Sequence, residues 1–423
     1  MKKIELPEKS TWSRILQRPV IDTATLEQQV KGVLDVVKQD GDKAVLQFTR
    51  QFDGVQLSSI IVTDDEIELA IQQVPDELKR AIKQAANNIR VFHEQQRPAI
   101  EVVETMKGVR CWRKSVGIDK VGLYIPGGTA PLFSTILMLA IPAQIAGCKE
   151  VILCSPPNKE GKLNPAILYA ASLTGVNKIY KIGGVQAIAA MAYGTETVPK
   201  VYKIFGPGNQ YVTCAKQLVQ QEGTAIDMPA GPSEVCVLAD ASANPSFVAA
   251  DLLSQAEHGV DSQVLLVSTD NQMIDAVMNQ LTVQLEQLSR KEIAAKALEN
   301  SQAILVKNIE DAIELVNEYA AEHLIISCEQ DEWIAEKITN AGSVFLGNYS
   351  PESVGDYASG TNHTLPTNGF ARAYSGVSLD SFVKKITYQR LTKEGLVAIA
   401  PTVTTMAAAE GLEAHKNAVT IRL

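Results

Sequence analysis

The sequence predicts an α/β protein built on parallel sheets. Nine short runs rich in Val and Ile follow one another along the chain, and most are separated by segments long enough for a helix. Strands that alternate with helices indicate βαβ crossovers, which give parallel sheets covered on both faces. With 423 residues and 46% hydrophobic composition, the chain is long enough for at least two domains.

The predicted strands all lie after residue 120. They are expected at 121–125, 150–154, 178–182, 201–205, 234–239, 263–268, 303–306, 324–328 and 342–346. The preceding residues have a helical pattern, with helices expected at 23–39, 41–52, 64–73 and 76–95, the last ended by Pro98. The most apolar window, Pro131 to Gly147, falls short of the roughly 18 uninterrupted apolar residues that a membrane span needs, so it predicts a buried helix.

A glycine- and proline-rich stretch, Met228 to Ser233, interrupts the series of strands near its middle. We therefore expect two stacked α/β units, one of which includes the N-terminal helices. The expected boundaries are an irregular arm at 1–20, a first unit at 21–123 and 235–378, a second unit at 124–234, and a tail at 379–423. The tail has one helical pattern, Met406 to Lys416, and is too small to bury a core alone, so it must dock on its own body or on a partner subunit.

The composition favours a small-molecule ligand. A net charge of −9 and a pI near 5.3, with no Lys/Arg cluster, argue against nucleic acid or an anionic membrane as the main partner. The basic residues of the N-terminus precede no apolar segment, which indicates a cytoplasmic protein rather than a secreted one. The six cysteines show no Cys-x-x-Cys spacing, so neither a disulfide framework nor a cysteine zinc site is indicated.

Three predicted strand-to-helix junctions are rich in glycine. They are Tyr124 to Thr129, Ile182 to Gln186, and Phe205 to Asn209. At such junctions backbone N–H groups and the helix dipole accept phosphate. None completes Gly-x-Gly-x-x-Gly, because Tyr211 stands at the third glycine position of the last one. The three loops together still favour a ligand at the strand carboxyl ends, where Tyr124 and Asn209 are placed to contact a base and a ribose.

Gln255 and His258 stand three residues apart at the end of an apolar helical pattern, which puts both on one face. Glutamine is a poor zinc ligand by itself, so further donors are needed. Asp356 lies in a glycine-flanked loop, free to aim its carboxylate, and the histidines available are His93, His258, His323, His363 and His415. Spacing alone does not bring these together.

Three of these histidines have distinct expected roles. His323 follows Glu322 where a helical pattern gives way to a strand, and such a pair is suited to proton chemistry. His93 lies in a polar helical stretch and is expected on the surface. His363 closes the loop of Asp356, so it is a candidate to orient that residue.

Several long motifs occur together and in order: Val121 to Gly128, Lys203 to Asn209, Asp227 to Glu234, and Gln255 to His258. On these motifs the chain resembles the histidinol dehydrogenase family. The resemblance covers nearly the whole length and includes Glu322-His323, the loop from Ser353 to His363, and the segment from Glu410 to His415.

The resemblance implies an enzyme that uses zinc and NAD to oxidise L-histidinol to L-histidine, the last step of histidine biosynthesis, in two hydride transfers through a bound aldehyde. It implies two incomplete Rossmann-like domains with terminal extensions, and a homodimer that exchanges its C-terminal segment. One zinc per subunit would be held by Gln255, His258, Asp356 and His415, the last from the other subunit. Ser233 and Glu410 would contact substrate together with His323 and the zinc ligands, and Tyr124, Gln186 and Asn209 would contact NAD.

Within that framework His323 is the expected general base for the alcohol proton, because an imidazole near its unperturbed pKa accepts a proton at pH 7. Glu322 would activate the water that adds to the aldehyde. Zinc would act mainly as a template that orients substrate.

Three alternatives to this function stay open. A related dehydrogenase could act on another primary alcohol. A zinc hydrolase would not need the three glycine-rich loops and would not need NAD. A non-catalytic nucleotide-binding protein would leave Gln255, His258, Glu322 and His323 without a task.

Overall fold

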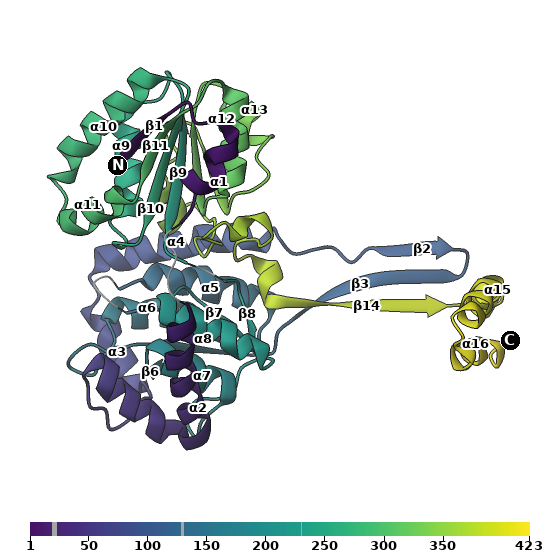
Figure 1. The fold of residues 1–423 in the computed structure, drawn as a ribbon. Helices are drawn as coiled ribbons and strands as arrows, with labels where there is room; N and C mark the ends of the chain where they lie inside the picture. The colour runs from purple at the N-terminus through teal and green to yellow at the C-terminus, as the bar shows by residue number, and fades with distance from the viewer. Residues whose placement is uncertain (19–22, 128–130, 230) are drawn as a thin grey trace.

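The computed structural model describes residues 1–18, 23–127, 131–229 and 231–423, and it confirms the α/β class. One parallel sheet has six strands in the order β1-β11-β10-β9-β12-β13, and a second has five in the order β6-β5-β4-β7-β8. Figure 1 shows the two sheets in separate units, one above the other. All nine predicted strands are present.

The six-stranded sheet consists of β1 (Lys2–Glu5), β9 (Glu234–Ala239), β10 (Gln263–Ser268), β11 (Gln302–Leu305), β12 (His323–Ser327) and β13 (Ser343–Leu346). Its helices are α9 (Pro245–Ala256), α10 (Asn271–Leu285), α11 (Lys291–Glu299), α12 (Ile309–Tyr319), α13 (Asp331–Ala335) and α14 (Glu352–Tyr357). The expectation of an irregular arm at 1–20 is wrong at its start, because β1 pairs in parallel with β11. This edge strand carries one apolar residue in four, which is too little pattern to identify it.

The five-stranded sheet consists of β4 (Lys120–Tyr124), β5 (Glu150–Ser155), β6 (Lys178–Lys181), β7 (Lys203–Phe205) and β8 (Ala225–Ile226). Its crossover helices are α5 (Phe133–Ala146), α6 (Pro165–Leu173), α7 (Gly184–Tyr193) and α8 (Gln210–Gln221). The segment predicted as a buried helix is α5, most of which is buried. Among the described residues, no helix combines the length and apolar character that crossing a bilayer requires.

The N-terminal helices pack on the five-stranded sheet. They are α2 (Thr23–Phe48), bent at Gly41, α3 (Asp64–Gln73) and α4 (Asp76–Glu94). Helix α2 packs on α7 and α8, α3 on α6, and α4 on α5. The prediction that they belong with 235–378 is therefore wrong, and the expected boundary at 123/124 cuts β4. The sequence pattern identifies an apolar helix face but not the surface that covers it.

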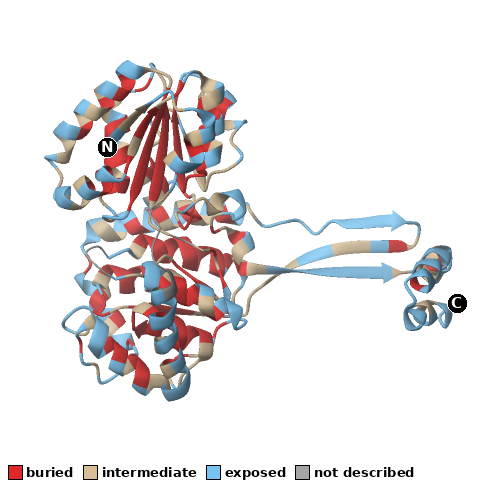
Figure 2. Cartoon of the chain, in the orientation of Figure 1, coloured by how far each residue is buried: buried red, intermediate tan, exposed pale blue. Residues whose placement is uncertain are grey.

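A third, antiparallel sheet forms an arm that projects from the body (Figure 1). Its strands are β2 (Val102–Met106), β3 (Val109–Gly117) and β14 (Val383–Leu391), and it ends in α15 (Lys393–Ala409) and α16 (Glu413–Thr420). Figure 2 shows exposed residues along most of the arm. The tail therefore begins beside the body, where Phe382 stacks on Phe205, but its two helices lie far from it. The single helix predicted at 406–416 is divided by Gly411, whose φ is 71°.

Candidate functional site

The predicted proton-transfer pair lies at the amino end of β12, beside the amino end of the neighbouring strand β9. His323 is the first residue of β12 and stands in register with Val235 of β9. Because these strands are parallel, Ser233 and Glu322, which immediately precede them, lie at the same edge of the sheet. The fold thus brings Ser233 to the same place as Glu322 and His323, although up to 90 positions separate them in the sequence.

The backbone of Glu234 fixes both members of the pair. Its N–H donates to Glu322 Oε2 at 2.9 Å, and its carbonyl lies 3.2 Å from His323 Nδ1. A carbonyl only accepts, so Nδ1 carries the hydrogen and Nε2 is left as the reactive nitrogen. Nε2 is buried and, within the described chain, has no hydrogen-bond partner, although Asp356 Oδ1 lies 3.4 Å away.

Helices α9 and α14 contact each other and bring an amide and two carboxylates to the same place. Gln255 is fully buried in α9, while Glu352 and Asp356 belong to α14. In one amide orientation, Gln255 donates to Glu352 Oε1 at 3.0 Å and accepts from Glu234 N at 3.1 Å. In the opposite orientation its oxygen faces only acceptors, so the first is the one that the surroundings select.

Burial and charge shift the proton equilibria of this cluster. Burial raises the pKa of Glu322 to about 7 and that of Glu352 to about 8. Burial alone would lower the pKa of His323, but the negative charge of Glu322, with those of Asp356 and Glu352, outweighs it and raises this pKa to about 10. The expectation of an unperturbed imidazole pKa is therefore wrong for the chain by itself.

The body of one chain brings together three of the four predicted metal ligands. Gln255 and Asp356 are described above, and His258 lies just beyond the end of α9, near enough to Asp356 for their charges to interact. His258 is exposed in the single chain, yet partial desolvation lowers its pKa, while the charge of Asp356 opposes this shift. Burial favours the neutral form of Asp356, but His323 and the other nearby histidines outweigh it and hold the pKa of this carboxyl below its usual range.

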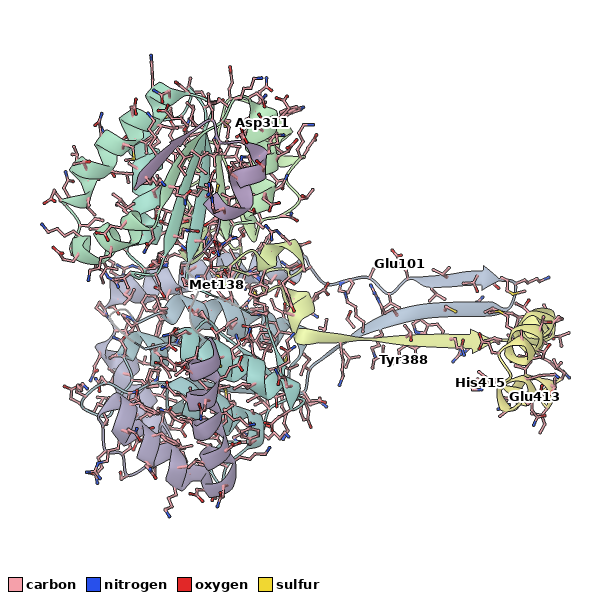
Figure 3. The ribbon with its side chains drawn as sticks, in the orientation of Figure 1. Glu101, Met138, Asp311, Tyr388, Glu413 and His415 are labelled. Atoms are coloured by element: carbon pink, nitrogen blue, oxygen red, sulfur yellow. The ribbon has the colours of Figure 1, made fainter. Side chains whose placement is uncertain are left out.

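The fourth predicted ligand, His415, lies in α16 at the far end of the arm, as Figure 3 shows, and Glu410 ends α15 in the same region. Both are exposed. Over the ranges that the structure describes, no group of three or more His, Cys, Asp or Glu residues is arranged to hold a metal ion. Of those residue types, the predicted set has only His258 and Asp356 in the body of one chain.

Two other histidines tie the site to the five-stranded unit. His363 Nδ1 lies 2.8 Å from the backbone oxygen of Asp356, and Nε2 lies 3.1 Å from Thr135 Oγ1 of α5. It thus fixes the backbone of Asp356 rather than its carboxylate.

The expectation that His93 is a surface residue is wrong: it is fully buried, with Nδ1 2.8 Å from Ile89 O, because α4 packs this face against α5.

The three predicted NAD-contacting residues line one cavity of about 1250 Å³ in the five-stranded unit. Tyr124 ends β4, Asn209 follows β7 and Gln186 lies in the first turn of α7, so the cavity opens at strand carboxyl ends as predicted. Tyr124 Oη accepts from Gly184 N at 3.1 Å, and Asn209 caps α8. Gly128 and Thr129 of the first glycine-rich junction lie outside the described residues.

Gly206 shows why one of these junctions needs glycine. Its φ is 127°, and a Cβ there would lie 2.0 Å from the backbone oxygen of Tyr124. Glycine therefore permits β4 and the turn after β7 to approach closely at the cavity. This is a local packing requirement, and it does not depend on a complete dinucleotide fingerprint.

Arg18, which anchors Glu234, was not predicted as part of the site. Arg18 donates to both carboxylate oxygens of Glu234, at 2.7 and 2.8 Å, and to the backbone oxygen of Tyr319 at 2.8 Å. Its guanidinium also lies 4.0 Å from the centre of the Tyr319 ring. The Glu234 side chain is 2% exposed, so this is a buried bidentate ion pair. Residues 216 positions apart share no local motif, so the sequence gives no sign of this pair. Glu352 was missed as well, although it immediately precedes the loop from Ser353 to His363.

Comparison with known proteins supports the family resemblance along the chain. The family model described as histidinol dehydrogenase matches residues 16–423. A histidinol dehydrogenase of Bacteroides thetaiotaomicron is 62% identical over 423 residues, covering 100% of this chain and 99% of that protein. One of Aliivibrio fischeri is 54% identical and covers 97% and 93%. The crystal structure of histidinol dehydrogenase from Elizabethkingia anophelis superposes with a TM-score of 0.98 at 56% identity, over 100% of this chain and 98% of that one.

Replacing Arg18 should destabilise the protein strongly. Arg18→Met leaves the buried carboxylate of Glu234 without its cation, and loss of one partner of a buried pair costs about 3–5 kcal/mol. Chemical denaturation followed by circular dichroism measures the free energy of unfolding. Arg14→Met, an exposed position four residues earlier, is the control and should change it little. Equal stability of the two variants would contradict an anchoring role for the ion pair.

Proposed function

Because the chain belongs to the histidinol dehydrogenase family, and is thus an oxidoreductase of histidine biosynthesis, we propose that it converts L-histidinol to L-histidine with zinc and two molecules of NAD. The observation that carries the proposal is that Asn209, predicted to contact NAD, shares a cavity with Glu234, whose backbone holds Glu322 and His323. Asn209 lines the 1250 Å³ cavity and also a cavity of about 450 Å³ that Pro232 and Glu234 line. A residue suited to contact a dinucleotide thus borders the same space as the residue that positions the proton-transfer pair.

The donor set fits a zinc ion. An amide oxygen, an imidazole and a carboxylate are borderline N and O ligands of the kind zinc accepts. Asp356 Oδ1 is buried without a hydrogen-bond partner in the described chain, as expected of an atom reserved for a ligand. Gln255, His258 and Asp356 would hold the ion, with His415 of the partner subunit as the fourth ligand. When bound, the metal supplies a fixed positive charge that orients the substrate's nitrogen donors and offsets the carboxylates around His323.

His323 and Glu322 would divide the proton transfers. His323 Nε2 would take the alcohol proton as the first hydride leaves for the bound dinucleotide, which gives the aldehyde. Water would then add to the aldehyde carbonyl: Glu322 would take a proton from that water and His323 would return its proton to the carbonyl oxygen, which gives the hydrate and frees Nε2. His323 would take a hydroxyl proton of the hydrate as the second hydride leaves for a second dinucleotide, which gives the carboxylic acid. The fixed Nδ1–H on Glu234 keeps Nε2 directed at this chemistry through both steps.

The arm supports a homodimer with an exchanged C-terminal segment. Several large apolar side chains on it are exposed in the single chain: Val102, Val103, Ile386, Val397 and Met406. A partner that covers them would also receive Glu410 and His415. Glu410 is suited to the substrate's ammonium group, and Ser233 would approach the substrate from the start of β9. The proposed reaction uses soluble metabolites, and we place the protein in the cytoplasm.

Product stoichiometry tests the proposed reaction. Purified protein given L-histidinol and excess NAD should form two NADH per histidine, because both oxidations occur before release. Chelator treatment should abolish NADH formation and zinc should restore it. A single NADH per substrate would identify an alcohol dehydrogenase that stops at the aldehyde, and turnover unaffected by the chelator would contradict a metal site.

Separate roles for His323 and Glu322 predict different defects in two variants. His323→Ala should lower the rate of histidinol oxidation by roughly 100-fold or more, the usual range for loss of a general base. Glu322→Gln should mainly slow NADH formation from supplied histidinal, because the hydration step needs its carboxylate. Thermal melts of both variants control for folding. Equal losses of the Glu322→Gln variant with histidinol and with histidinal would rule out separate roles.

A further inference from the structure

One acidic side chain in the dinucleotide cavity has no role in the function proposed above. Asp53 lies at the end of a short π-helical turn, Thr49–Asp53, which follows α2 and is closed by Gly54 with φ 69°. It is half-buried and lines the 1250 Å³ cavity together with Tyr124 and Gln186. Its placement comes from the N-terminal helices that pack on this unit, not from a glycine-rich motif.

The contact between Asp53 and Gln186 leaves two hydrogen-bond acceptors together. Gln186 Nε2 donates to Asp53 Oδ2 at 3.4 Å, which favours this orientation of the amide. Gln186 is fully buried, and its Oε1 has no hydrogen-bond partner in the part of the chain described. A buried amide oxygen without a partner is costly unless a ligand satisfies it. The cavity wall therefore offers a carboxylate and a neighbouring amide oxygen to a ligand that donates two hydrogen bonds.

Two lysines line the same cavity as Asp53. Lys159 Nζ donates to the backbone oxygen of Asp53 at 3.2 Å, and Lys159 and Lys162 both line the cavity. Burial raises the pKa of Asp53 to about 6, and the charge of Lys159 opposes this shift, so the carboxylate is mainly ionised at neutral pH. The cavity wall thus combines an acceptor pair with lysines suited to a pyrophosphate.

We propose that Asp53 and Gln186 Oε1 accept the two hydroxyl hydrogens of a ribose vicinal diol, so that Asp53 selects a dinucleotide with a free 2′-hydroxyl over one with a 2′-phosphate. A phosphate monoester in its ionised form has no hydrogen to donate and brings negative charge against the carboxylate. An acidic residue has this task in ordinary dinucleotide folds, where it follows the fingerprint by about 20 residues. In this chain Asp53 instead precedes β4, the first strand of the five-stranded sheet along the sequence. The inference rests on the proposed use of NAD and names how that cofactor is recognised.

Equilibrium binding measured by calorimetry tests the inference without turnover. The wild-type zinc-loaded protein should bind NAD more tightly than NADP. Asp53→Asn and Asp53→Ala should weaken NAD binding by roughly 10-fold, the loss expected for a hydrogen bond to a charged group. NADP binding should be unchanged or stronger, so the ratio of the two affinities should fall by 10-fold or more. Asp35→Asn, an equal charge change at an exposed position of α2, should leave the ratio unchanged.

The possible outcomes separate this inference from the proposed function. A wild-type protein that binds neither dinucleotide would overturn the cofactor assignment and the inference with it. Equal wild-type affinity for NAD and NADP, or an Asp53 variant that loses both in proportion, would overturn only the role of Asp53. Thermal melts exclude unfolding as the cause of a loss, and the affinity ratio is insensitive to a partial loss of folded protein.

Discussion

The buried charge of Glu234 is the constraint on which the candidate site depends. Its side chain is held by Arg18 and also accepts from Asn368 N at 2.9 Å, while its backbone holds Glu322 and His323. A buried carboxylate without a partner is strongly unfavourable. The N-terminal segment and the loop that contains Asn368 must therefore be in place before β9 and β12 can present the proton-transfer pair. Glu234 therefore stabilises the fold through its side chain and positions the candidate site through its backbone.

The two sheets contribute different ends of their strands. The five-stranded sheet presents carboxyl ends around the cavity of Tyr124, whereas the six-stranded sheet presents the amino ends of β9 and β12. Contacts across the units are specific: Asn362 Nδ2 donates to the backbone oxygen of Met138 at 2.6 Å, and His363 meets Thr135. Figure 3 labels Met138 at this junction. In the proposed reaction, NAD in the cavity of Tyr124 and the base His323 would meet only while these contacts persist.

The sequence predicted most of the regular structure and the site residues that lie in local motifs. The bounds of β9 and β10 match the expected runs, because buried parallel strands are continuous apolar segments. Strand β2 was missed because all its residues are exposed in the single chain. Arg18 and Asp53 were missed because their partners, Glu234 and Gln186, are 216 and 133 positions away. His93 was predicted to lie on the surface because the polar residues around it in the sequence obscure the apolar pattern of the buried face of α4.

One chain alone does not hold the whole predicted metal site, and the central claim is that a second chain completes it. Mixing His415→Ala subunits with His258→Ala subunits, after unfolding and refolding together, tests this claim directly. Each variant alone should be inactive, whereas a mixed dimer has one intact site, so an equal mixture should regain roughly a quarter of wild-type activity. Recovery near that level supports exchange of the C-terminal segment, and no recovery above the separate variants would contradict it.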